Sequence, residues 1–151
     1  MPEFKILNSK EIKQVHKLIE EQWGAKLKLD YGFLQNTKNR IFIITRGISS
    51  LDFSQLRINS AGMYLCEIDD KGIRLSIEGS QIVGPHASNN IVEFDEAESR
   101  SWLKGEDIMK ECDCKGFVII KSKNDFIGSG KYSNGKILNY IGKTRRINSM
   151  D

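Results

Sequence analysis

The first regular pattern along the chain is a helical repeat of apolar positions within residues 9–23, SKEIKQVHKLIEEQW. Apolar residues recur every three or four positions from Ile12 to Trp23, while lysines and glutamates occupy the opposite side. Ser9 offers an N-cap, and Gly24 is a typical helix stop. The segment therefore predicts an amphipathic helix that buries one side.

Alternation of apolar and polar positions replaces the helical repeat after this helix and predicts β-strands. The extended segments predicted in the first half of the chain are 26–30, 31–34, 40–45 (RIFIIT), 63–68 (MYLCEI) and 73–77 (IRLSI). Polar clusters at 36–39 and 69–72 predict turns between them. Residues 48–58 fit either partial alternation or a short helical turn, and residues 78–84 predict a short helix or a single turn of one.

A further helix is predicted after a short strand at residues 91–94 and a loop at 85–90. Asp95 followed by Glu98 is a capping-box arrangement, and acidic residues crowd the first turn, where the helix dipole favours them. The helix ends at Leu103, with a glycine stop two residues later. Trp102, next to Leu103 at the helix end, is interpreted as a core residue rather than a stacking platform.

The last third of the chain, residues 116–148, predicts strand, turn, strand, turn and strand. The run from Phe117 to Ile120 is β-branched and aromatic, which is typical of a largely buried strand. Asn124-Asp125 is a turn signal, and Ser129-Gly130 and Asn134-Gly135 offer residues that tolerate positive φ at later reversals. These patterns together predict an α+β fold with a small α+β module at 1–60 and a second β-rich unit at 61–151.

The composition is that of a soluble globular protein, with 39% hydrophobic and 28% charged residues in 151. No apolar run approaches the length of a membrane span, and the N-terminus lacks a signal-peptide core, so we expect a cytoplasmic protein without membrane contact. The cysteines Cys66, Cys112 and Cys114 are an odd number and too few for a disulfide framework. With only two histidines, His16 and His86, a zinc site is disfavoured against ordinary thiols.

The net charge of +3 hides a strong asymmetry along the chain. Residues 1–65 carry ten basic and six acidic side chains, residues 66–114 carry five and twelve, and residues 115–151 carry eight and two. A basic β-rich unit suggests a partner that is a polyanion, most simply RNA. An ordinary solvated surface is the alternative, and the acidic middle block could instead dock a basic protein.

Three motifs carry a resemblance to a known family: RLSIEGSQIVG at 74–84, WLKGEDI at 102–108 and IGSGKYSNGKILN at 127–139. In this order they resemble the PUA family of RNA-binding domains, most closely the C-terminal PUA-like domain of Fmu/Sun-type rRNA cytosine-C5 methyltransferases. The resemblance implies a PUA-like mixed β pseudobarrel with short helices over roughly residues 60–148. The first 58 residues resemble, by order of elements, the small module that precedes the PUA domain in several ribosome-biogenesis proteins.

The departure from those methyltransferases concerns catalysis. Their catalytic domain needs a glycine-rich loop for S-adenosylmethionine and a cysteine nucleophile near a proline. Gly128-Ser129-Gly130 lies between late β-segments, whereas a dinucleotide-binding loop lies between a first strand and a helix. Cys112 and Cys114 lack a neighbouring proline. Glu106 and Asp107 are interpreted as capping a turn rather than as an acid–base pair. We therefore expect no cofactor and no enzymatic activity.

The resemblance, carried over by position, places an RNA site on the short helix and on a late strand. Two physical reasons support it: a glycine lets a phosphate approach the backbone, and a tyrosine can stack on a base. A lysine-rich and arginine-rich tail would extend the site. The residues expected at the site are Glu78, Gly79, Ser80, Gln81, Gly130, Lys131, Tyr132, Lys136, Lys143, Arg145 and Arg146.

Each of these residues also has a purely structural interpretation. Gly79 could simply serve a turn, Tyr132 could pack in the barrel, and the last basic residues could be a solvated tail. His16, beside the apolar stripe of the first helix, is interpreted as a partly exposed helix residue rather than a ligand or a base.

The sequence thus predicts a non-catalytic protein that binds structured rRNA or tRNA, as an accessory factor in ribosome biogenesis or RNA modification. A modification enzyme or a ribosomal protein is a possible further partner. The alternative is an adaptor that docks a basic partner through its acidic middle segment. The adaptor predicts that reversing Glu96 and Glu98 matters more than reversing Lys131 and Lys136.

Overall fold

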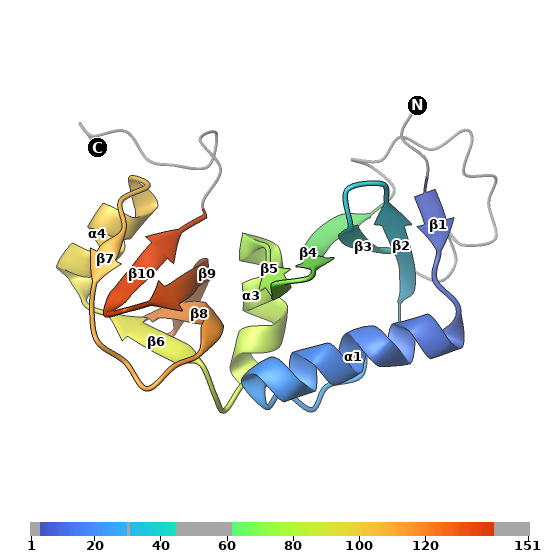
Figure 1. The fold of residues 1–151 in the computed structure, drawn as a ribbon, viewed down its shortest axis with the longest axis horizontal. Helices are drawn as coiled ribbons and strands as arrows, with labels where there is room; N and C mark the ends of the chain where they lie inside the picture. The colour runs from blue at the N-terminus through green and yellow to red at the C-terminus, as the bar shows by residue number, and fades with distance from the viewer. Residues whose placement is uncertain (1–3, 30, 45–61, 141–151) are drawn as a thin grey trace.

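The computed structural model describes residues 4–29, 31–44 and 62–140, in which two five-stranded sheets and three α-helices are found (Figure 1). The first sheet is antiparallel throughout, with the strand order β1-β2-β3-β4-β5. Its strands are β1 (Phe4–Ile6), β2 (Gly32–Asn36), β3 (Arg40–Ile44), β4 (Met63–Asp69) and β5 (Gly72–Leu75). Strands β2 to β5 confirm the extended segments predicted after residue 30, and residues 48–58 lie outside the described part.

Helix α1 (Ser9–Trp23) spans the residues predicted for it and lies across the first sheet (Figure 1). Its buried residues Val15, Ile19 and Trp23 belong to the same core as the inner side chains of that sheet. The predicted cap at Ser9 is wrong by one residue. Asn8 is the N-cap and forms a capping box with Glu11, because a side-chain oxygen there reaches the N–H three residues on.

The predicted strand at 26–30 is wrong, since the described residues 24–29 form no regular structure. The segment is held against α1 by His16. The Leu29 N–H donates to His16 Nε2 at 3.0 Å, and His16 Nδ1 lies 3.0 Å from the Ile12 carbonyl oxygen. Only a neutral imidazole with its proton on Nδ1 satisfies both contacts. The Leu29 N–H, which would pair with a neighbouring strand if this segment were extended in a sheet, thus donates to the side chain of His16 on α1.

Helix α3 (Ile77–Val83) and the short 3-10 helix η3 (Gly84–His86) connect the two sheets. Ser76 caps α3: its Oγ accepts from Gly79 N at 2.8 Å and lies 2.6 Å from the Tyr64 carbonyl oxygen, to which it donates. The short helix expected at 78–84 is therefore confirmed, and its start is tied to β4.

The second sheet has the order β6-β8-β9-β10-β7 and is mixed, because β6 runs parallel to β8 while the other pairs are antiparallel. Its strands are β6 (Ile91–Phe94), β7 (Ile108–Met109), β8 (Gly116–Ser122), β9 (Asp125–Ser133) and β10 (Lys136–Asn139). Helix α4 (Glu96–Leu103) follows β6, with the predicted capping box between Asp95 and Glu98. The α+β class and the PUA-like mixed β pseudobarrel are confirmed.

One of the predicted reversals is wrong. Ser129 and Gly130 lie inside β9 rather than in a turn. A Cβ built on Gly130 would stand 2.5 Å from the Trp102 ring, so this glycine makes room for the buried indole. The reversal at Asn134-Gly135 is confirmed, with φ of 48° and 80°, and it joins β9 to β10.

Strand β8 contributes to two hydrophobic cores at once. Phe117 and Ile119 belong to the core shared with α1 and the first sheet. Val118 and Ile120 point to the other side, where they join the core around Trp102. Both sides of the strand are buried, as its continuous apolar run predicted, and Trp102 is confirmed as a core residue.

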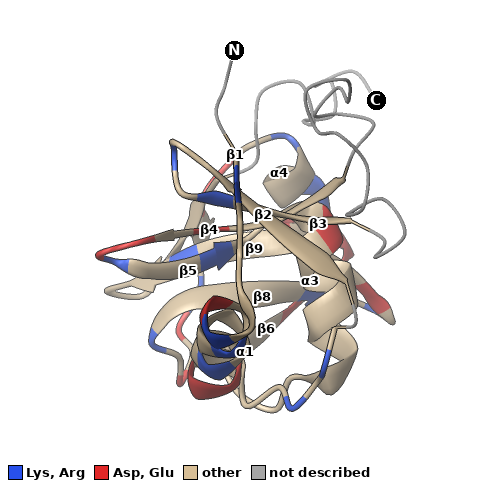
Figure 2. Ribbon diagram, turned by 90° about the vertical axis from the view of Figure 1, so that its right-hand side faces the viewer, with Lys and Arg blue, Asp and Glu red and all other residues tan. Residues whose placement is uncertain are grey.

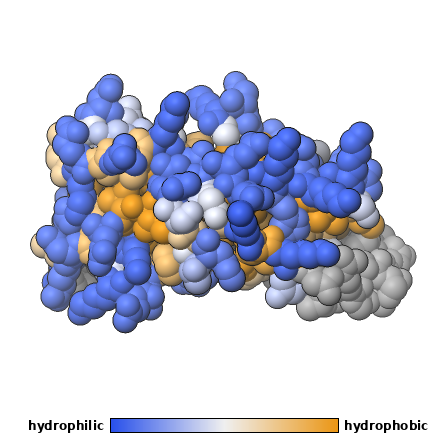
Figure 3. Space-filling model, turned by 90° about the horizontal axis from the view of Figure 1, so that it is seen from below, coloured by the Kyte–Doolittle hydropathy of each residue, from blue (hydrophilic) through white to orange (hydrophobic). Residues whose placement is uncertain are grey.

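The side of the molecule that carries α1 is mostly hydrophilic. In Figure 2, α1 is seen nearly end-on, with both basic and acidic residues along it. Figure 3 shows the side on which α1 lies in Figure 1, where apolar side chains reach the surface only as separate areas among hydrophilic ones. Among the described residues, no helix is both long and apolar enough to cross a membrane.

We expect replacement of His16 by alanine to lower the free energy of unfolding by about 1–3 kcal/mol, because it leaves the Leu29 N–H without its acceptor. Lys13→Ala, at an exposed position of the same helix, is the matched control and should change stability by less than about 0.5 kcal/mol. Urea unfolding followed by circular dichroism measures both. Equal stability of the two variants would contradict the role given to His16.

Candidate nucleic-acid interface

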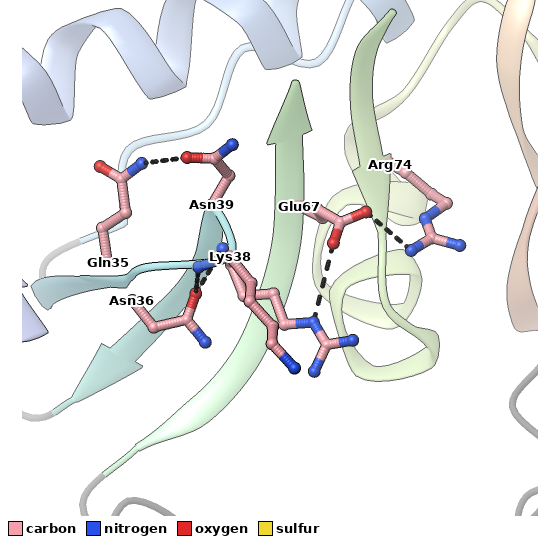
Figure 4. Close-up of polar contacts among 7 residues, drawn as sticks. Gln35, Asn36, Lys38, Asn39, Glu67 and Arg74 are labelled. Carbon is pink, nitrogen blue, oxygen red and sulfur yellow. Dashed lines mark hydrogen bonds and ion pairs between the residues drawn. The ribbon is translucent and has the colours of Figure 1, made fainter. Parts of the chain in front are cut away.

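Three charged side chains form a row across the outer side of the first sheet, facing away from α1. Arg40 on β3 pairs in register with Glu67 on β4, which pairs in turn with Arg74 on β5. The Glu67 carboxylate lies 3.7 Å from Arg40 Nε and 2.9 Å from Arg74 Nη2 (Figure 4). One carboxylate therefore fixes two guanidinium groups on neighbouring strands.

The β2–β3 turn sets the position of Arg40. The side-chain oxygen of Asn36 accepts from the backbone N–H groups of Lys38 and Arg40, both at 2.9 Å (Figure 4). Asn39 has a left-handed φ of 63°, which asparagine tolerates better than most residues. Its carbonyl oxygen accepts from Ile68 N at 3.0 Å, so the turn is also attached to β4.

Each of the two guanidinium groups lies over an aromatic ring. The Arg40 guanidinium is 5.7 Å from the centre of the Tyr64 ring, and that of Arg74 is 4.8 Å from the centre of the Tyr140 ring. Such cation–π contacts add roughly 0.5–1 kcal/mol each at exposed sites. The arginines are thereby held by both charge and ring contacts, with Glu67 between them.

The row continues onto the second sheet. Tyr140, directly after β10, packs edge-on against Phe117 of β8 with ring centres 5.9 Å apart. Lys131 Nζ on β9 lies 5.6 Å from the same Phe117 ring. We call this surface the Arg–Tyr row, and its residues are Arg40, Tyr64, Glu67, Arg74, Tyr140, Phe117 and Lys131.

The members of the row differ in how far they reach solvent. The side chain of Arg40 is 45% exposed and Tyr140 is 42% exposed, whereas the side chains of Glu67 and Arg74 are each 23% exposed. Burial raises the pKa of the Tyr64 phenol. With two arginines and one lysine against a single glutamate, the row carries a net positive charge and offers N–H donors suited to phosphate oxygens.

The glycines and the serine predicted at the RNA site are buried. A Cβ on Gly79 would stand 2.2 Å from the Leu65 carbonyl oxygen, so the bare Cα allows α3 to approach β4. Ser80 is fully buried, and its Oγ donates to the Ile77 carbonyl oxygen at 2.6 Å. Gly130 faces Trp102. These three residues were predicted at an RNA-binding surface, but in the structure they are buried and have packing roles.

The other predicted residues on the second sheet lie on two sides of it. Lys131 and Lys136 share one side, while Tyr132 lies on the other and packs against the core around Trp102. Tyr132 is half-buried, and its hydroxyl is 3.4 Å from a Glu111 carboxylate oxygen. Lys136 Nζ is 3.4 Å from Asp107 Oδ2. Of this group, the structure brings only Lys131 into the Arg–Tyr row.

The remaining predicted residues are placed elsewhere. Gln81 is exposed and lines a hollow of about 580 Å³ between α3 and the β8–β9 turn, together with Phe126. Glu78 is half-buried on the same helix. Lys143, Arg145 and Arg146 lie outside the described residues.

Asp107, considered in the sequence for acid–base chemistry, has a structural role instead. Its Oδ1 accepts from Asn139 N at 2.8 Å, and the carbonyl oxygen of Glu106 accepts from the Asn139 side chain at 2.9 Å. These contacts hold the end of β10, the strand that leads into Tyr140.

The three cysteines are free thiols. Cys66 is buried in the first core, and burial raises its pKa. Burial and the neighbouring Cys112 raise the pKa of Cys114 to about 12, which keeps that thiol protonated at neutral pH. Within the described part of the chain, no group of three or more His, Cys, Asp or Glu side chains could hold a metal ion.

Sequence reasoning missed Arg40, Arg74 and Tyr140. Strand alternation was a sufficient signal to place both arginines on the outer side of the sheet. Only the register of β3, β4 and β5 shows that they flank Glu67, and nothing in the local sequence around Tyr140 indicates that its ring meets Arg74.

The fold defines a small α+β protein with a PUA-like mixed sheet, and comparisons with known proteins specify the domain. Residues 89–147 match the family model described as the methyltransferase RsmF PUA domain. This match covers the second and third sequence motifs and begins after the first. Residues 89–147 are therefore similar to the PUA domain of these rRNA methyltransferases.

Relatives over most of the chain have the same description, ribosomal RNA small subunit methyltransferase F. The protein of Aeromonas salmonicida is 26% identical over 139 residues, which is 91% of this chain and 28% of the relative. That of Aeromonas hydrophila is 27% identical over 136 residues, 89% of this chain and 28% of the relative. That of Vibrio cholerae (strain M66-2) is 26% identical over 102 residues, which is 67% of this chain and 21% of the relative. The chain thus spans between 21% and 28% of the length of these relatives.

We expect Gly79→Ala to destabilise the protein even though alanine favours helix by about 1 kcal/mol over glycine. The new methyl group would overlap the Leu65 carbonyl oxygen, and such overpacking costs about 1–3 kcal/mol. Gln81→Ala, at an exposed position of the same helix, is the control and should leave the thermal unfolding midpoint nearly unchanged. A Gly79→Ala protein as stable as the wild type would contradict the packing role of this glycine.

Proposed function

We propose that the protein binds structured RNA, and that the Arg–Tyr row is the surface that contacts it. The observation that carries this proposal is the continuous row of arginine, tyrosine and lysine across two sheets, in a chain that contains a PUA domain of an rRNA methyltransferase family. Guanidinium groups held over rings keep N–H edges free for phosphates, and the rings suit nucleotides.

Within this proposal, the RNA is rRNA or tRNA and the protein is a cytoplasmic accessory factor in RNA modification or ribosome biogenesis, without catalytic activity of its own. Two features support it: the relatives are rRNA methyltransferases, and the family match falls on their PUA domain. A modification enzyme or a ribosomal protein remains the proposed protein partner.

We also propose that the chain is organised as two closely packed units, with the first serving to complete the RNA surface. The sequence placed the boundary near residue 60. Strands β4 and β5 pair into the first sheet, and the family match starts at residue 89, which together support a boundary between η3 and β6. Both units supply residues to the row: Arg40 and Arg74 come from the first, and Lys131 from the second.

The test is binding to total tRNA and to fragments of small-subunit rRNA, measured by fluorescence anisotropy over a salt series. The variant Arg40→Gln/Lys131→Gln removes two charges from the row and should reduce the slope of log K against log salt by about 0.7–0.9 per lost phosphate contact. Lys13→Gln/Lys28→Gln removes the same charge at exposed positions by α1 and is the matched control. Equal salt slopes for the two double variants would contradict the assignment of the surface.

Absence of RNA binding at low salt would favour the adaptor hypothesis. Glu98 is already engaged by the capping box and by Lys110 Nζ at 2.9 Å, so reversing it would also disturb the fold. Glu93 and Glu96 are exposed, so reversing their charges tests the acidic surface without removing the contacts of Glu98. Binding of a basic ribosomal protein that Glu93→Lys/Glu96→Lys abolishes would then replace the RNA proposal.

A further inference from the structure

We propose that the RNA bound by the Arg–Tyr row presents an unpaired nucleotide, whose base stacks on Tyr140. This inference rests on the proposed RNA-binding function and names the class of RNA it requires. It assigns Tyr140 as the residue that distinguishes an RNA with an unpaired base from a continuous duplex.

Tyr140 is exposed, yet its ring is held in place by two neighbours. The Arg74 guanidinium lies 4.8 Å from the ring centre, and the Phe117 ring meets it edge-on at 5.9 Å and 62°. Arg74 is itself fixed by its 2.9 Å bond to Glu67. Tyr140 nevertheless remains 42% exposed. A ring that is both fixed and exposed gives up little entropy when a base stacks on it.

Tyr64, the other tyrosine of the row, is less accessible than Tyr140. Arg40 lies over its ring at 5.7 Å, and the Phe42 ring is 5.5 Å away at a tilt of 40°. It is half-buried, and burial raises the pKa of its phenol. The Tyr64 ring is thus enclosed by its neighbours, whereas Tyr140 reaches solvent.

The charges beside Tyr140 suit the phosphates that flank a stacked base. A guanidinium has five N–H donors; Arg74 donates to Glu67 through Nη2 at 2.9 Å, and Arg40 Nε forms an ion pair with the same carboxylate at 3.7 Å. Lys131 Nζ lies 5.6 Å from the centre of the Phe117 ring, which packs against Tyr140. One cation therefore lies over the Tyr140 ring and a second over its aromatic neighbour, where both suit the phosphates of a nucleotide stacked on Tyr140.

An unpaired base is needed because the bases of a duplex already stack on each other and cover their own faces. Proteins that recognise single-stranded loops, bulges and ends place the exposed bases on aromatic rings or on guanidinium planes. Tyr140 next to Arg74 supplies both kinds of surface at one position.

The experiment compares an RNA hairpin of one stem sequence in three forms: fully paired, with a single-nucleotide bulge, and with a 3′ overhang. Each unpaired position carries 2-aminopurine, whose fluorescence is quenched by stacking. We expect the wild-type protein to bind a hairpin with an unpaired nucleotide about 5- to 100-fold more tightly than the paired form and to quench the probe. Tyr140→Ala should abolish both the preference and the quenching.

Two further variants separate stacking from other effects. Tyr140→Phe keeps the ring and should retain the preference and the quenching. Tyr31→Ala removes another exposed tyrosine, directly before the first residue of β2 and away from the β2–β3 turn, and should behave as the wild type. Thermal unfolding of each variant shows whether the fold is intact.

Equal affinity of the wild-type protein for all three hairpins would overturn the inference while leaving RNA binding itself intact. The same holds if Tyr140→Ala folds and keeps the preference. Failure of the wild-type protein to bind any hairpin, tRNA or rRNA fragment would overturn both the inference and the proposed function.

Discussion

Strand β8 is the element on which the rest of the structure depends, because both of its sides are buried. Phe117 and Ile119 pack toward the first sheet and α1, while Val118 and Ile120 pack toward Trp102. Each sheet alone would leave one apolar side uncovered, and burial of a large aliphatic side chain contributes about 1.5–3 kcal/mol. The two sheets are therefore joined through the packing of one strand, and a surface that crosses from one sheet to the other becomes possible.

The Arg–Tyr row exists because of this junction. Phe117 closes the core shared with the first sheet, and the same ring contacts Tyr140 and Lys131 at the surface. Tyr140 in turn meets Arg74, which Glu67 holds beside Arg40. A surface ion pair alone contributes little to stability. Its consequence here is geometric, since it orients two guanidinium groups without neutralising the positive charge of the row.

Much of the fold could be predicted from local patterns. The 3.6-residue repeat identified α1, the Asp95–Glu98 capping box identified α4, and the continuous apolar run identified β8. The errors arose where a tertiary contact overrides a local signal. His16 accepts the Leu29 N–H in the segment 26–30, whose alternation predicted a strand. Gly130, predicted at a reversal, lies within a strand, where the missing Cβ leaves room for Trp102. Of the residues predicted for the RNA site, Lys131 lies in the Arg–Tyr row, and Gly79, Ser80 and Gly130 are buried.

The sequence by itself determined the α+β class, the main helices and strands, the PUA resemblance and the basic character of the last third. These follow from local periodicity, capping and motif order, which need no knowledge of distant contacts. Only the tertiary structure decided which residues form the surface. Gly79 and Ser80 proved to be packing residues, and Arg40, Arg74 and Tyr140 came together from segments that are distant in the chain. The physical reason is that strand register and the packing of two sheets are set by long-range burial, to which no local pattern is sensitive.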